Sequence, residues 1–149
     1  MNDPIFFYGK KYYMFSNFSS FAIEWKGKVY MTSEHVYQSE KFEDGFLQEE
    51  IRMERSAHTA FTRAQELRKD HIRSDWDAVK VSVMKEILHH KVTQHSFVRD
   101  TLMSTEERDI IEDSPVDAFW GWGPNKDGKN MLGKLWMEVR EEVRKTNKF

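Results

Sequence analysis

The sequence contains no cysteine. Disulfide-bonded scaffolds, cysteine-based zinc and iron–sulfur sites, and cysteine nucleophiles are therefore excluded. The sequence also lacks the run of roughly 20 apolar residues that crosses a membrane, and its first residues lack the basic and apolar segments of an export signal. We therefore expect a cytoplasmic protein that does not enter a membrane.

Neither sign of charge dominates. The 23 basic and 25 acidic residues leave a formal net charge of −2, whereas a protein that binds nucleic acid by charge alone needs a strong positive excess. The sequence has three prolines, at positions 4, 115 and 124, and no linker rich in proline or glycine. Its 149 residues are the length of one ordinary domain, so we expect a single domain over residues 1–149.

Aromatic residues, in contrast, are abundant. Five Trp, five Tyr and 11 Phe make up 14% of the chain, and many of them precede residue 43. Such residues can fill a hydrophobic core or stack on the planar face of a base or sugar. Composition leaves both uses open.

Hydrophobic spacing predicts an α+β fold that is predominantly helical, with a small N-terminal β-hairpin or sheet packed on helices. Lys26-Gly27 is typical of the tight turn of a hairpin, and apolar positions three and four residues apart predict helices through most of the remaining chain. Asn130 is expected to cap the last helix. Strands are expected at 5–8, 21–25, 28–31 and 108–112, and helices from 33 onward and at 46–54, 57–69, 76–90, 96–103 and after 130.

One polar stripe could carry chemistry. Glu34, Gln38 and Lys41 fall at positions i, i+4 and i+7 of the helix that begins at Ser33. A carboxylate and a lysine so spaced can form an ordinary exposed ion pair. Alternatively, Glu34 can act as an acid or base beside a planar ligand, and Lys41 can contact a phosphate or attack a sugar carbon as an amine.

A glycine-rich loop over residues 117–133 is the second candidate. Its glycines allow close approach of the backbone to a ligand, and a helix start nearby could bind an anion. The loop matches neither a P-loop nor a dinucleotide-binding motif, and a tight loop with Trp120 and Trp122 packed on the core explains it equally. The histidines show no metal-ligand spacing, so we expect no catalytic metal.

Four motifs, in order and with fitting separations, resemble the NADAR (YbiA-like) family. The resemblance covers residues 5–145. It is carried by residues 15–18 (Phe-Ser-Asn-Phe), by residues 33–42, by residues 73–77 with Lys80 and Val83-Met84, and by residues 114–121 continuing through 128–133 to Val139-Arg140.

The resemblance implies a compact α+β domain that hydrolyses N-glycosidic bonds between a base and a ribose 5-phosphate or ADP-ribose unit. The implied substrates are ribosylamino-pyrimidine intermediates of riboflavin synthesis or ADP-ribosylated guanine in nucleic acid. No cofactor is implied, and no protein partner is indicated. A non-catalytic module that binds ADP-ribose or NAD is the alternative, and a single-strand nucleic-acid binder is disfavoured by the net charge.

The resemblance also implies the site residues. One stretch departs from the family pattern, because Pro124 and Asn125 stand where a more glycine-rich loop is expected. How the leaving group or the phosphate of a substrate fits against this loop is therefore left open. The implied catalytic residues are Glu34, Asp117, Trp76 and Lys41, and the implied substrate-binding residues are Phe15, Asn17, Phe18, His35, Gln38, Trp120, Gly121 and Asn130.

Two mechanisms remain open for such an enzyme. Cleavage of a ribosyl C1′–N bond builds oxocarbenium character, which a carboxylate near C1′ stabilises while a second group activates water or protonates the base. We expect Glu34 and Asp117 to fill these roles in one aromatic-walled cleft. Alternatively, the ribose ring opens and Lys41 captures C1′ as a Schiff base.

Overall fold

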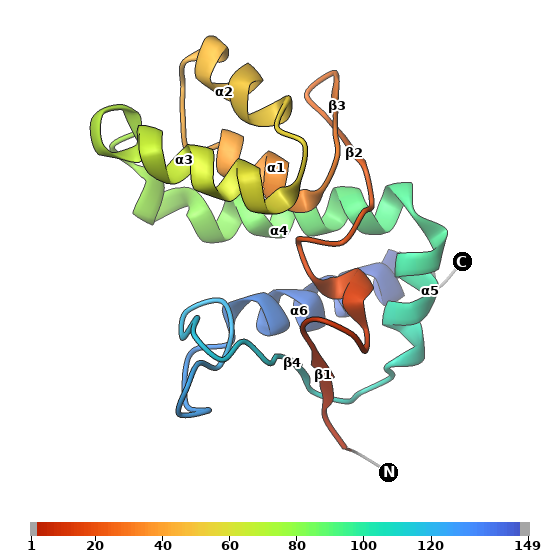
Figure 1. The fold of residues 1–149 in the computed structure, drawn as a ribbon. Helices are drawn as coiled ribbons and strands as arrows, with labels where there is room; N and C mark the ends of the chain where they lie inside the picture. Colours follow the sequence, from red (N-terminus) through yellow and green to blue (C-terminus); the bar gives the residue numbers. More distant parts are fainter. Residues whose placement is uncertain (1–2, 147–149) are drawn as a thin grey trace. The chain divides into compact units, whose positions relative to one another are not determined.

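The computed structural model describes residues 3–146 and confirms the predominantly helical α+β class (Figure 1). None of the helices in this range combines the length and the hydropathy that crossing a bilayer requires. The elements are β1 (Ile5–Phe7), the 3₁₀ helix η1 (Tyr13–Phe15), β2 (Ile23–Trp25), β3 (Lys28–Tyr30), α1 (Ser33–Ser39), α2 (Gly45–Arg52), α3 (Ala57–His71), α4 (Trp76–Gln94), α5 (Ser96–Ser104), β4 (Ile110–Glu112) and α6 (Met131–Thr146).

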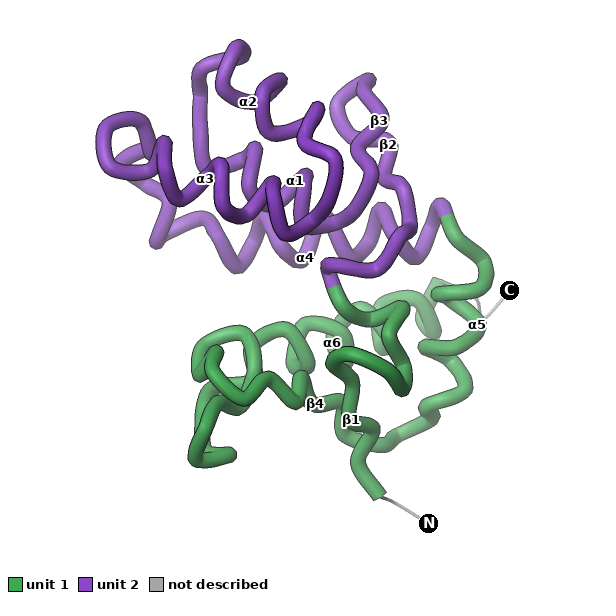
Figure 2. The backbone as a smooth tube through the Cα atoms, in the orientation of Figure 1, with its two compact units in different colours: residues 1–16, 95–149 green, residues 17–94 purple. Residues whose placement is uncertain are grey.

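The chain divides into two compact units (Figure 2). One is the continuous segment Asn17–Gln94, which we call the central unit. The other combines Met1–Ser16 with His95–Phe149, and we call it the terminal unit. A single domain over residues 1–149 stays a prediction.

The central unit begins with the predicted hairpin. Strands β2 and β3 pair antiparallel, with Ile23 opposite Tyr30 and Trp25 opposite Lys28. The two residues between them, Lys26 and Gly27, have φ values of 51° and 83°. Left-handed backbone at both turn residues matches the twist of the strands, so the local sequence is sufficient to fix this hairpin.

Helix α1 is the centre of this unit. It packs against α2, α3, α4 and both hairpin strands, and Figure 2 shows α3 beside it and α4 beneath it. Every residue from Thr32 to Phe42 is buried, although the segment is rich in polar side chains. Buried polar groups need partners or a function, so this segment is the first place to look for a site.

Small side chains allow α3 to approach α1 closely. Ala60 and Ala64 lie one turn apart on α3 and form a hydrophobic cluster with Phe42 and Ile51. The helix is held at its start by a reciprocal capping box between Ser56 and Thr59. Helix α4 runs four residues beyond its expected end near residue 90, to Gln94.

The terminal unit contains a strand pairing that the sequence did not predict. Strand β1 does not join the hairpin; it pairs in parallel with β4, so that Ile5 lies opposite Ile110. Helix α6 packs against β4. The buried rings of Phe15 and Trp136 lie 5.0 Å apart, and the Trp136 indole donates a hydrogen bond of 3.0 Å to the Phe15 carbonyl.

Gly133 is a packing requirement of α6. A Cβ atom at this position would collide with the carbonyl oxygen of Ile110 on β4. We expect Gly133→Ala to lower the free energy of unfolding by about 1–3 kcal/mol, because a strand backbone cannot yield as a flexible side chain can. Urea denaturation measures this loss. Gly9→Ala is the matched control, since no atom of the described residues lies within 4 Å of its added Cβ. Equal stability of the two variants would refute the explanation.

Candidate active site

The predicted polar stripe forms a buried cluster in the central unit. The Gln38 side-chain amide donates a hydrogen bond of 2.6 Å to Glu34 Oε2. Glu34 and Lys41 are only 7% and 6% exposed. Lys41 lies two residues past the end of α1, but Glu40 between them keeps a right-handed helical backbone, so the spacing of the stripe continues. The exposed ion pair considered above is therefore ruled out.

Lys41 has an altered acidity. Burial lowers the pKa of its ammonium group to about 8, and the carboxylate of Glu34 opposes this shift because it favours the charged form. The charges of Arg68 and Lys80 lower the pKa further. About a tenth of the Lys41 side chains are consequently neutral at pH 7, far more than for an ordinary lysine.

Two aromatic rings line this cluster. The rings of Tyr37 and Trp76 lie 5.1 Å apart at an angle of 60°, and Lys41 Nζ lies 5.4 Å from the centre of the Tyr37 ring. Trp76 was among the predicted site residues, whereas Tyr37 was not. Its position three residues after Glu34 and four before Lys41 was the available signal.

Three buried oxygen atoms near Glu34 have no hydrogen-bond partner among residues 3–146. They are Asn17 Oδ1, Ser33 Oγ and Gln38 Oε1. The Asn17 carbonyl accepts the Glu34 amide at 3.0 Å, while its side-chain NH₂ lies 3.3 Å from Met84 Sδ. Because buried polar atoms are nearly always paired in folded proteins, these atoms are candidates to accept hydrogen bonds from the hydroxyl groups of a ligand.

His35 is tied to the protein through both ring nitrogens. Nδ1 lies 2.7 Å from the Thr32 hydroxyl and Nε2 lies 2.9 Å from the Glu54 carbonyl. The carbonyl can only accept, so Nε2 carries the proton, and burial lowers the pKa of the ring. These contacts favour a structural role for His35 over the expected substrate contact.

The remaining expected residues of the central unit lie just before the hairpin. Asn17 is buried and joins the cluster through Glu34, as described. Phe18 is 39% exposed, so its ring is accessible. Phe15, in contrast, belongs to the aromatic core of the terminal unit and is fully buried there.

Asp117 organises the glycine-rich loop of the terminal unit. Its Oδ1 accepts hydrogen bonds from the backbone amides of Phe119 and Trp120, at 2.9 and 2.8 Å. The ring of Trp120 packs edge-on against Phe119, with 4.8 Å between centres. A Cβ at Gly121 would lie 2.9 Å from the Glu112 carbonyl, so glycine is required for the loop to pack on β4.

Asn130 has a different role from the expected helix cap. Its side-chain Oδ1 accepts the Glu112 amide and its Nδ2 donates to the Ile110 carbonyl, both at 2.9 Å. The Asn130 side chain thus pairs with the backbone of β4 and anchors the loop. Its contact with α6 is made by the backbone carbonyl, which accepts a hydrogen bond from the Lys134 amide.

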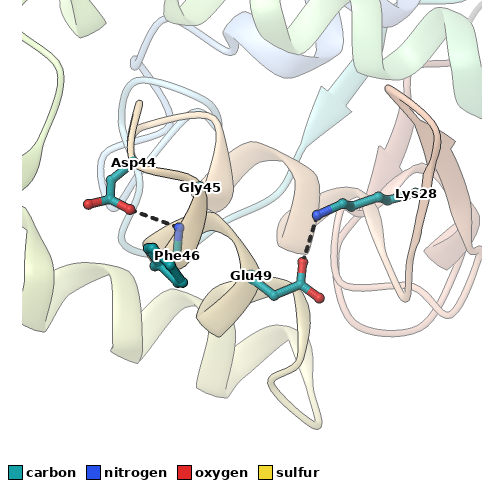
Figure 3. A pocket seen from close by; sticks show the side chains of 5 residues that line it. All are labelled: Lys28, Asp44, Gly45, Phe46 and Glu49. Carbon is teal, nitrogen blue, oxygen red and sulfur yellow. Dashed lines mark hydrogen bonds and ion pairs between the residues drawn. The ribbon is translucent and has the colours of Figure 1, made fainter.

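A separate open hollow of about 600 Å³ lies on the central unit (Figure 3). It is lined by Lys28, Asp44, Gly45, Phe46 and Glu49 and contains none of the predicted site residues. Lys28 is paired with Glu49 at 3.1 Å. Hydrogen bonds from Arg52 and Lys28 lower the pKa of Glu49 to about 2, which makes it a poor proton donor.

The family model of the NADAR domain matches residues 6–144. The chain belongs to the NADAR family. N-glycosidase YbiA of Escherichia coli (strain K12) is 40% identical over 129 residues, covering 87% of this chain and 80% of that protein. Its NMR structure matches with a TM-score of 0.89 and 37% identity, over 99% of this chain and 90% of that chain.

Two further NADAR relatives extend the comparison. N-glycosidase Npun_R5314 of Nostoc punctiforme (strain ATCC 29133 / PCC 73102) is 39% identical, covering 94% of this chain and 92% of that protein. Riboflavin biosynthesis protein VVA0006 of Vibrio vulnificus (strain YJ016) is 36% identical, covering 96% of this chain but only 39% of that protein.

The NADAR residues that the structure brings together all come from the central unit. Trp76 and Lys41 lie against the ring of Tyr37. Gln38 is hydrogen-bonded to Glu34, which in turn adjoins Asn17. Within residues 3–146, no group of three or more His, Asp or Glu side chains is placed to hold a metal ion. The expectation that Glu34 and Asp117 share one cleft stays a prediction.

Proposed function

We propose that this NADAR-family protein is an N-glycosidase that hydrolyses the bond between C1′ of a ribose unit and a nitrogen of a base. The observation that carries the proposal is the buried pair of Glu34 and Lys41, held beside the rings of Tyr37 and Trp76. Relatives named as N-glycosidases are about 40% identical over most of the chain.

Glu34 has the chemistry that this bond cleavage requires. As the C1′–N bond breaks, positive charge develops on C1′ and the ring oxygen, and a fixed carboxylate stabilises that charge. The hydrogen bond from Gln38 fixes the orientation of the Glu34 carboxylate. Tyr37 and Trp76 offer rings on which a base or a ribose can stack.

Lys41 supports a covalent route through the same site. The ring oxygen leaves C1′ as a hydroxyl group, which gives an imine between C1′ and the base nitrogen. The neutral Lys41 amine adds to C1′, the base nitrogen takes a proton and departs, and a C1′=N–Lys41 Schiff base remains. Water then adds to C1′ and releases the sugar as its aldehyde together with free Lys41.

The acidity of Lys41 predicts the pH dependence of this route. Only the neutral amine reacts, so kcat/KM should rise with pH and level off above about 8, where the ammonium has lost its proton. At pH 6 the rate should be about a hundredfold below the plateau. Initial rates from pH 6 to 9.5 check this, and a profile that falls as pH rises through 8 would show that protonated Lys41 is required instead.

The substrate class is part of the proposal. Ribosylamino-pyrimidine intermediates of riboflavin synthesis and ADP-ribosylated guanine both contain the required C1′–N bond, and both follow from the family resemblance. We also propose that the protein is located in the cytoplasm. We also propose Asp117 as the second carboxylate of the reaction. Its Oδ1 already accepts hydrogen bonds from two loop amides.

A substrate panel tests the function. The purified protein is incubated with a ribosylamino-pyrimidine phosphate, an oligonucleotide that carries ADP-ribosylated guanine, and ADP-ribose, and the products are separated by liquid chromatography. We expect free base and free sugar phosphate or ADP-ribose from at least one of the first two compounds. Tight binding of ADP-ribose without release of any base would instead identify a non-catalytic binding module.

A further inference from the structure

Residues 17–21, which precede the hairpin, are fastened to helix α4 at two places. The Asn17 side-chain NH₂ lies 3.3 Å from Met84 Sδ. The Ser19 hydroxyl accepts a hydrogen bond of 3.0 Å from Lys91 Nζ. Because Met84 and Lys91 are seven residues apart, they lie on one face of α4. The segment therefore lies along this face of the helix.

Lys91 is a buried cation in an apolar part of α4. Its side chain is fully buried, as are those of Ile87 and Leu88 in the preceding turn. Its Nζ lies 5.5 Å from the centre of the Phe21 ring. Burial lowers the pKa of the Lys91 ammonium group to about 7, because the charged form loses its contact with water.

Stability alone does not explain a lysine at this position. Removing an ammonium group from water costs free energy, and apolar side chains of similar volume often replace buried charged groups without loss of stability. The lysine adds a directional hydrogen bond to Ser19 from a rigid helix. A buried polar contact of this kind can select one conformation of the segment that it holds.

Ser19 lies two residues from the candidate site. Two residues of extended chain span at most about 7 Å, so fixing Ser19 restricts where Asn17 can lie. The Asn17 carbonyl accepts a hydrogen bond of 3.0 Å from the Glu34 amide. Phe18 has an accessible ring, whereas Asn17 and Ser19 on either side of it are buried. The anchor at Ser19 thus acts on both of the expected substrate-binding residues next to it.

We propose that Lys91 is a positioning residue for the candidate site and acts through Ser19. Its hydrogen bond keeps Asn17 against Glu34 and Phe18 in its accessible position. The inference rests on the proposed N-glycosidase function, because the residues that Lys91 positions are those expected to bind the substrate. Loss of the contact should therefore weaken substrate binding and leave the chemical step nearly unchanged.

NMR spectra of the ¹⁵N-labelled protein without ligand test the positioning. The signals compared are the side-chain NH₂ of Asn17 and the backbone amide of Glu34. We expect both to move in Lys91→Met and in Ser19→Ala, because each variant loses the same hydrogen bond. Lys69→Met makes the same substitution at an exposed lysine of α3 and should leave both signals in place. Unchanged signals in both Lys91→Met and Ser19→Ala would overturn the inference.

Initial rates separate positioning from a purely structural role. Lys91→Met and Ser19→Ala should each raise KM by about 3- to 10-fold and keep kcat within about twofold of the wild type. The double variant should have the KM of the single variants, because the contact is lost only once. Reduced stability alone would lower kcat with the amount of folded protein and leave KM unchanged, and that result would overturn the inference. Ser19→Ala removes a single oxygen atom, so it decides the matter if Lys91→Met does not fold.

Failure of the proposed function has a different signature. If the wild type releases no base from any compound of the substrate panel, the N-glycosidase function is overturned. The spectra recorded without ligand then still decide whether Lys91 holds Asn17 against Glu34.

Discussion

Replacing Glu34 with glutamine should lower kcat for base release by about 10²- to 10⁴-fold. The substitution preserves size and can keep the hydrogen bond with Gln38, but it removes the negative charge that stabilises the developing charge at C1′. Substrate binding should change much less, because the ribose and base contacts remain. Initial rates over a range of substrate concentrations separate the two effects.

Glu50→Gln is the matched control for this variant. Glu50 is an exposed helical glutamate of the same unit, paired with Arg63, so its loss should leave kcat within about twofold and stability within about 0.5 kcal/mol. Melting temperatures of both variants establish that they are folded. Wild-type turnover by the Glu34→Gln variant would remove Glu34 from the mechanism.

Replacing Lys41 with arginine should be equally severe, with a loss of about 10²- to 10⁴-fold in kcat. Arginine keeps the positive charge beside Glu34, but its guanidinium stays protonated at all working pH values and cannot attack C1′. Borohydride added during turnover should reduce the Schiff base and leave a sugar adduct on Lys41, which peptide mass spectrometry locates.

The distribution of adducts is the control for the trapping experiment. The charge of Lys80 acts on Lys41, but Lys80 is not proposed to react, so its peptide should carry no adduct. Near-normal turnover by Lys41→Arg, together with no adduct in the wild type, would favour direct attack of water assisted by Glu34.

Local interactions explain which parts of the fold could be predicted. The hairpin turn at Lys26-Gly27 is decided by the backbone of two residues, and the helices by spacing that repeats over a few turns. The pairing of Ile5 with Ile110 joins residues from opposite ends of the chain. Two short strands carry no sequence signal of their partner, so their pairing could not be foreseen.

The same distinction applies to the candidate site. Glu34, Gln38 and Lys41 were found because helical periodicity places them on one stripe. Lys91 was not assigned, because its contact with Ser19 joins two segments that lie far apart in the chain. Asn130 was expected at a helix cap from its place in the sequence, whereas tertiary contacts direct its side chain to β4.

The location of the ribose site on α1 is the central claim, and an NMR titration tests it most directly. Ribose 5-phosphate is added to ¹⁵N-labelled wild-type protein, and amide shifts are mapped on the sequence. We predict the largest shifts at residues 33–42 and at the indole N–H of Trp76. Shifts centred on the open hollow at Lys28, Phe46 and Glu49, with the signals of α1 unchanged, would contradict the claim.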